Sequence, residues 1–205
     1  MNTSSIRAGL LASLAVCGAA QGMPIQYTAN GTITSITGAP PYGMTATVGQ
    51  GVSSVFVYDP LAPDLSPSPA FGHYNFAATP NCSYTDVFGS GDVSFTSFFD
   101  VFVTLDPTFD ELEVHSSLNI FVNGTMQPSA EMYLHFRNGP GTVFQSDALP
   151  PETLTMANWQ FGNGYLRDVA TGQRVDFTVT ALTGVPTPPG VALLALAAVP
   201  LRRRR

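Results

Sequence analysis

The chain has 205 residues, of which 14 are Asp or Glu and eight are Arg, with no Lys, so its net charge is −6. Residues 23–184 hold all 14 acidic residues and only three of the arginines, which leaves that stretch with a net charge of −11. A surface this acidic repels phosphate backbones, which argues strongly against nucleic acid as a partner. The hydrophobic content of 44% argues against general disorder, and the length suits one domain.

Residues 1–22 are typical of a secretory signal peptide. Arg7 gives the segment its positive charge, residues 8–17 form an apolar run, and a stretch rich in small residues follows. Cleavage by signal peptidase after Ala20 or Gly22 fits the small side chains that this enzyme reads. The sequence therefore predicts an exported protein.

Residues 23–184 alternate between apolar and polar side chains, as half-buried β-strands require. The alternation is clearest in residues 93–105, 112–122, 132–137 and 174–181. Asn-Gly pairs, which favour tight turns, begin at Asn30, Asn123, Asn138 and Asn163. We expect one all-β domain over residues 23–184, an antiparallel β-sandwich of roughly eight to ten strands, of which the jelly roll is one form.

Two features of the first half of this domain carry specific expectations. Residues 59–69 contain four prolines, which predicts an extended surface loop between strands and not a domain boundary. Cys82 is the one cysteine that remains once the leader is removed. We expect it to be a buried, inert thiol or to form an intermolecular disulfide in an oxidising envelope.

The aromatic residues Phe98 and Phe102 fall on the polar side of their strand. Aromatic rings on a sheet face can stack on sugar rings, so these two residues are candidates for glycan stacking. Burial by a second layer of the sandwich is the alternative interpretation.

Four acidic residues, Asp106, Asp110, Glu111 and Glu113, follow the Phe-rich strand. Clusters of oxygen ligands on loops suit calcium, although their spacing matches no known calcium loop and a solvated turn is the alternative. Two of these carboxylates, if they flank a groove, would also serve as the acid and base of a glycosidase.

A second candidate metal site comes from the strands on either side of Asn123. If they pair as a hairpin centred near Thr125, His115 lies opposite His135 with Glu113 beside them. Two imidazoles and a carboxylate are ordinary ligands of zinc. Histidines on a solvated sheet face are the alternative, and no motif for a hydrolase, metalloprotease or phosphate-binding loop is present in the sequence.

Residues 185–205 have three ordered parts. Val185-Pro186-Thr187-Pro188 precedes an apolar segment that ends at Leu201, and Arg202, Arg203, Arg204 and Arg205 follow. Four arginines after an apolar segment stay on the cytoplasmic side of a membrane, although as a helix residues 189–201 span only about 20 Å of a ~30 Å hydrocarbon core. A simple tail anchor or a frayed basic end is one interpretation of these three parts.

This arrangement resembles the PEP-CTERM sorting signal of bacterial proteins that an exosortase-type membrane enzyme handles. In that family a Val-Pro-Glu-Pro-like motif precedes an apolar helix and an Arg-rich end, and here Thr187 stands where Glu is usual. The resemblance implies transient insertion in the inner membrane, delivery to the cell envelope or surface, and association with extracellular polysaccharide.

These observations together predict a secreted envelope or matrix component with a non-catalytic structural or interaction role. A carbohydrate-binding module or a small glycan-active enzyme is the alternative. No cofactor is implied, apart from the calcium and zinc ions considered above.

Overall fold

The computed structural model describes residues 23–77, 79–139, 141–150 and 153–186. Among these residues β-strands dominate, and two short 3-10 helices, η1 (Pro41–Gly43) and η2 (Met156–Asn158), lie between them. The strands in chain order are β1 (Ile25–Thr37), β2 (Gly51–Tyr58), β3 (Phe71–Ala77), β4 (Ser83–Phe88), β5 (Val93–Thr96), β6 (Phe98–Asp106), β7 (Phe109–Ser116), β8 (Ile120–Val122), β9 (Thr125–Gln127), β10 (Ala130–Asn138), β11 (Phe161–Asp168) and β12 (Arg174–Pro186).

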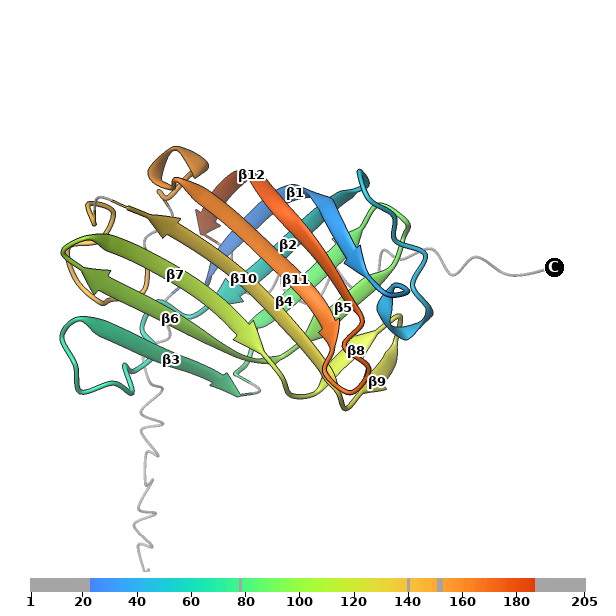
Figure 1. Ribbon diagram of the computed structural model, residues 1–205. Helices are drawn as coiled ribbons and strands as arrows, with labels where there is room; N and C mark the ends of the chain where they lie inside the picture. The colour runs from blue at the N-terminus through green and yellow to red at the C-terminus, as the bar shows by residue number, and fades with distance from the viewer. Residues whose placement is uncertain (1–22, 78, 140, 151–152, 187–205) are drawn as a thin grey trace, which may run out of the picture.

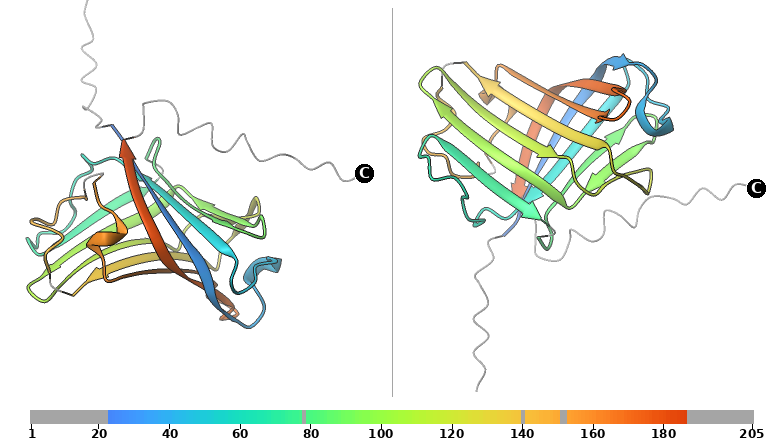
Figure 2. Two further views of the ribbon diagram at one scale, coloured as in Figure 1. Left: turned by 90° about the horizontal axis from the view of Figure 1, so that it is seen from above. Right: turned by 60° about the horizontal axis from the view of Figure 1, so that its bottom comes forward.

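The strands form one sheet in the order β3-β6-β7-β10-β11-β12-β1-β2-β4-β5-β8-β9. Every pairing is antiparallel, and the sheet is curled into a half-barrel (Figures 1 and 2). The prediction of an all-β antiparallel domain is therefore confirmed. Where a sandwich has two separate sheets, this domain has one sheet whose two halves face each other, because β12 and β1 pair and join the halves.

Aromatic side chains fill the space between the two halves. Tyr27, Phe56 and Tyr58 stack at centroid distances of 5.2 and 6.1 Å within one half. Tyr58 reaches Phe76 of β3 at 6.2 Å, and Tyr84 of β4 meets the ring of Phe99 of β6 edge-on at 6.4 Å. These contacts cross from one half to the other, so the curl of the sheet is what buries the core.

The chain passes from one half of the sheet to the other five times, between β2 and β3, β3 and β4, β5 and β6, β7 and β8, and β9 and β10. Two of these crossings, between β5 and β6 and between β7 and β8, are breaks that the alternation does not reveal. Between β5 and β6, the Thr96 hydroxyl accepts a hydrogen bond from the Phe98 amide at 3.0 Å and fixes a corner. Ser94 and Thr96 of β5 are fully buried, whereas its apolar residues Val93 and Phe95 are half exposed. The prediction of one apolar face along residues 93–105 is therefore wrong for residues 93–95. The second break lies at residues 117–119, between β7 and β8.

The Asn-Gly pairs take three different structural roles. Asn123 and Gly124 have φ angles of 50° and 81° and form the predicted tight turn, which closes the short hairpin of β8 and β9. Asn30-Gly31 instead marks an irregularity in the pairing of β1 with β12. Gly164 lies inside β11, against the ring of Phe177. The predicted turns at Asn30 and Asn163 are therefore wrong.

The first and last described strands, β1 and β12, lie side by side (Figure 2). They pair along their length, with Ile25 opposite Pro186. Val185 and Pro186 of the predicted sorting motif thus belong to β12, and the sheet extends two residues past the predicted boundary at residue 184. The predicted signal peptide, together with Thr187, Pro188, the apolar segment and Arg202–Arg205, lies outside the described residues.

The proline-rich segment follows the outer edge of the edge strand β3, as expected of a surface loop. The amide of Leu65 donates to the carbonyl of His73 at 2.8 Å, and the amide of His73 donates to the Asp64 carboxylate at 2.9 Å. These contacts occupy backbone groups of an edge strand that would otherwise pair with another chain.

Candidate functional site

The candidate site lies on the face of β3, β6, β7, β10, β11 and β12 that is turned away from the core, called here the outer face. Residues of one parity in these strands form the core, so residues of the other parity point outward. All three histidines and all three arginines of the described residues lie on this face: His73, His115, His135, Arg137, Arg167 and Arg174. The outer face therefore concentrates the groups that can bind ions or polar ligands.

The register of β7 and β10 corrects the predicted arrangement of the histidines. His135 lies opposite Glu113, and His115 lies opposite Tyr133. The two histidines are separated because β7 and β10 are not joined as a hairpin. The chain between them leaves for the other half of the sheet as β8 and β9, so Asn123-Gly124 does not set the β7–β10 register.

Glu111, Glu113 and His135 form a compact cluster in the middle of the outer face. His135 Nε2 lies 3.5 Å from Glu111 Oε1 and 4.0 Å from Glu113 Oε1. Tyr133 donates its hydroxyl to Glu113 at 2.6 Å, and Arg137 lies 3.1 Å from Glu111. His135 Nε2 is buried and makes no hydrogen bond. The cluster keeps Glu113 and His135 of the predicted zinc set and takes Glu111 in place of His115.

His115 belongs to a different cluster, which surrounds the buried Glu131. The Glu131 carboxylate accepts hydrogen bonds from Tyr165 at 2.7 Å and from Arg167 at 2.5 Å, and His115 lies 3.1 Å away. Burial raises the pKa of Glu131, but the hydrogen bonds from Tyr165 and Arg167 outweigh it, so the pKa lies below its usual value. This cluster is an internally satisfied ion network.

The predicted glycan-stacking residues Phe98 and Phe102 lie on β6, near the edge strand β3, and are both half-buried. The ring of Phe102 stacks on His73 at 4.7 Å and on Phe71 at 5.8 Å. Asp100, between the two phenylalanines, accepts hydrogen bonds from Asn75 at 2.8 Å and from His73 at 2.9 Å. Within the described residues, no second sheet covers either phenylalanine.

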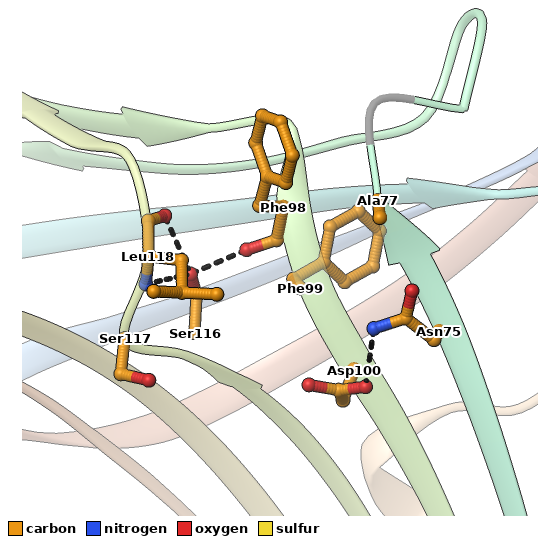
Figure 3. Close-up of a pocket in the computed structure, with 8 residues that line it drawn as sticks. All are labelled: Asn75, Ala77, Phe98, Phe99, Asp100, Ser116, Ser117 and Leu118. Atoms are coloured by element: carbon orange, nitrogen blue, oxygen red, sulfur yellow. Dashed lines mark hydrogen bonds between the residues drawn. The ribbon is translucent and has the colours of Figure 1, made fainter.

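A pocket lies beside Phe98 at this edge of the outer face (Figure 3). Its lining consists of Asn75, Ala77, Phe98, Phe99, Asp100, Ser116, Ser117 and Leu118. The hydroxyl of Ser116 donates to the carbonyl of Phe98 at 2.5 Å and so fixes the corner where the pocket begins. The pocket and the Phe71–His73–Phe102 stack together form one surface, called here the β3–β6 surface, with aromatic, amide and carboxylate groups.

The four acidic residues considered as a calcium site take separate roles. Asp110 is buried in the core, where it accepts backbone hydrogen bonds from Val143 at 2.6 Å and Phe144 at 3.1 Å. Asp106 accepts from the hydroxyl and amide of Thr108 in the β6–β7 turn. Glu111 and Glu113 point to the outer face. Asp110 and Glu113 therefore lie on opposite faces of β7, an arrangement in which they cannot flank one glycosidic bond.

Sequence reasoning did not identify a polar cluster inside the core. Asp86 of β4 is fully buried, and Ser54 and Ser94 lie directly opposite it on β2 and β5. Burial raises the pKa of Asp86 to about 7, and the nearby hydroxyls of Ser54, Tyr84 and Ser94 offset this in part. The hydroxyls of Ser54, Tyr84 and Ser94 and both carboxylate oxygens of Asp86 are buried without a hydrogen bond. The parity that Asp86 shares with Tyr84 and Phe88 is the signal that indicates its burial.

Cys82 is buried, as one of its two predicted states requires, and burial raises the pKa of its thiol to about 11. The thiol is therefore protonated at neutral pH and is a poor nucleophile.

No protein-family model, no curated protein and no solved structure matches this chain. In the part of the chain that the structure describes, no helix has the length and apolar character needed to cross a membrane. Functional conclusions therefore depend on the residues themselves.

Proposed function

We propose that this protein is a secreted component of the cell envelope or extracellular matrix, and that its domain acts by binding extracellular polysaccharide and not by catalysis. Export by signal peptidase cleavage near residue 22 and sorting by an exosortase-type enzyme at the PEP-CTERM-like end are parts of the same proposal. The observation that carries the binding role is the β3–β6 surface.

The chemistry of this surface suits sugars. The faces of Phe102 and Phe98 offer apolar stacking area for the C–H groups of a sugar ring. Asp100 and the amide of Asn75 already bond to each other at 2.8 Å, and such a pair can bond to adjacent hydroxyls of a sugar. The surface follows the side of an open sheet and is not enclosed, which favours a polymer that passes across it over a small molecule that must be surrounded.

The binding role is tested with a panel of soluble polysaccharides (alginate, dextran, xylan and a β-glucan) in affinity electrophoresis of the purified chain. Phe102→Ala is expected to weaken binding about fivefold or more, because a well-formed stacking contact contributes ~1 kcal/mol or more. Phe121→Ala is the matched control, since Phe121 is an exposed aromatic residue (40%) on β8, in the other half of the sheet. Equal loss in both variants, or no retardation by any polysaccharide, would refute the binding role.

The sorting role is tested by removal of residues 187–205, which leaves β12 intact to Pro186. We expect the truncated protein to be exported but no longer retained at the envelope, because the proline motif, the apolar segment and the four arginines are incomplete or absent. Arg202–Arg205 replaced by four Ser residues provides a milder test of the arginine block alone. Fractionation that finds full-length and truncated chains in the same compartment would contradict this role.

A further inference from the structure

We propose that Glu111, Glu113 and His135 bind a divalent transition-metal ion of the zinc type on the outer face. This site lies on β7 and β10 and is independent of the polysaccharide-binding role proposed for β3 and β6. Three features support this site: the geometry of the three ligand atoms, the unused hydrogen-bonding capacity beside them, and the contrast with the neighbouring Glu131 cluster.

The three side chains already hold their ligand atoms close together. One ligand atom from each residue lies within 4.8 Å of the other two, and the two nitrogen–oxygen distances are 3.5 and 4.0 Å. Zinc bonds of ~2.0–2.2 Å in tetrahedral geometry place neighbouring ligand atoms roughly 3.3–3.6 Å apart. Small rotations of the glutamate side chains are therefore enough to bring all three atoms to one ion.

The imidazole of His135 is held in place while its Nε2 atom is unused. The His135 side chain is 14% exposed, and its ring lies against Phe161 at 5.5 Å and Tyr133 at 5.8 Å. Nε2 is buried without a hydrogen bond, and so is Oδ1 of Asn163, the residue directly opposite His135 on β11. A metal ion would use the Nε2 lone pair, and Asn163 would accept a hydrogen bond from a water on that ion.

A neighbouring side chain contacts each of the two carboxylates. The Tyr133 hydroxyl donates to Glu113 at 2.6 Å, as a supporting residue behind a metal ligand does. Arg137 lies 3.1 Å from Glu111 and, among the described residues, is the one arginine that competes for this carboxylate. The Arg137 guanidinium also lies 4.2 Å over the ring of Phe109, a contact that it can keep when an ion binds.

The Glu131 cluster on the same face has similar residue types but no capacity for an ion. Each oxygen of Glu131 already accepts at least one hydrogen bond, from Tyr165 and His115 on one oxygen and from Arg167 on the other. By contrast, the three potential ligands Glu111, Glu113 and His135 share contact with a single described arginine, Arg137. The mixed nitrogen and oxygen set favours zinc over calcium, since calcium takes six to eight oxygen ligands.

The site is tested by calorimetric titration of the purified full chain, without a polyhistidine tag, with zinc chloride. We expect one zinc ion per chain in the wild type, and an affinity lower by about tenfold or more in His135→Gln and in Glu113→Gln, because each removes one of three ligands. His115→Gln is the matched control and should keep the wild-type affinity. Absence of zinc binding in the wild type, or equal loss in His115→Gln, would overturn the proposal.

A second measurement separates loss of a ligand from loss of the fold. Arg137→Gln removes the competing cation but no ligand, so this variant is expected to bind zinc at least as tightly as the wild type. In NMR spectra of the wild-type imidazoles, zinc should shift the ring signals of His135 and leave those of His73 and His115 unchanged. Weaker binding by Arg137→Gln, or a shift confined to His73 or His115, would also overturn the proposal.

Discussion

Asp86 shows how one buried residue makes stability depend on pH. Its carboxyl group is fully buried and its pKa is raised to about 7 from an ordinary 3.8. A group whose pKa is higher in the folded state contributes stability that is fully present below the unfolded pKa and is lost as pH rises through the folded pKa. For Asp86 this window extends from about pH 4 to about pH 7, and the loss across it amounts to roughly 3 to 4 kcal/mol.

We therefore expect the wild-type free energy of unfolding to fall between about pH 5 and about pH 7, and Asp86→Asn to remove most of this fall and to be the more stable form at the upper end. Carboxylates with lowered pKa values, such as Asp92 and Asp168, stay ionised in this window and do not contribute to the slope. Urea unfolding followed by fluorescence at several pH values gives the result. A wild-type profile that is flat or that rises across the window would contradict this account.

Gly164 illustrates how one position in a strand is fixed by its neighbours on the next strand. A methyl group at this position meets the ring of Phe177 and, at 2.7 Å, the carbonyl oxygen of Tyr133. We expect Gly164→Ala to lower the free energy of unfolding by about 1 to 3 kcal/mol through overpacking. Gly51→Ala is the control, because the nearest atom to its added methyl group is 3.9 Å away. Equal denaturation midpoints for the two variants would show that the contact with Phe177 relaxes without cost.

At the scale of elements, the sequence identifies strands better than it identifies their partners. The alternation in residues 132–137 and 174–180 gives strands with the observed faces, because burial of one face depends only on period two. The predicted face is wrong at Ala181, which is exposed while Leu182 is buried, because the irregularity opposite Asn30-Gly31 shifts the alternation by one residue. The β7–β10 register depends on the excursion through β8 and β9, which is a nonlocal event that no local pattern encodes. The observed register differs from the predicted one by two residues. Such a difference keeps every side chain on its face and changes only which residues lie opposite His135.

The same limit applies to the candidate sites. Phe98 and Phe102 lie on the polar side of β6, as their parity alone indicates, and both are half-buried there. The calcium hypothesis places Asp110 and Glu111 in one site. Neighbouring residues in a strand point to opposite faces, and the two side chains lie on opposite faces of β7. The sequence analysis does not predict the burial of Asp86. Burial of an ionised carboxylate is energetically unfavourable, so acidic residues are assigned to the surface unless their parity in the strand is examined.

At the scale of the whole molecule, the pairing of Ile25 with Pro186 brings the start of β1 and the end of β12 side by side (Figure 2). Paired residues of antiparallel strands lie only ~5 Å apart, so a short linker can join them. A circular permutant that joins Pro186 to residue 23 through Gly-Ser-Gly and opens in the exposed loop at residues 65–66 is expected to fold.

Its thermal midpoint should lie within about 5 °C of the parent, because no strand is interrupted. A second permutant, opened between Phe177 and Thr178, cuts β12 at the centre of the sheet and should not fold. Near-UV circular dichroism during thermal unfolding measures both. A folded second permutant would mean that the β12–β1 junction is dispensable.

The central position of β12 also has a consequence in time. The strand lies between β11 and β1, so it joins the two halves of the sheet although it is the last described strand to be synthesised. Until it emerges, β1 and β11 each present an unpaired edge, and the aromatic core between the halves cannot close. A chain that crosses a membrane from its N-terminal end would therefore remain unfolded until its final strand had followed, and would depend on holding chaperones during that interval.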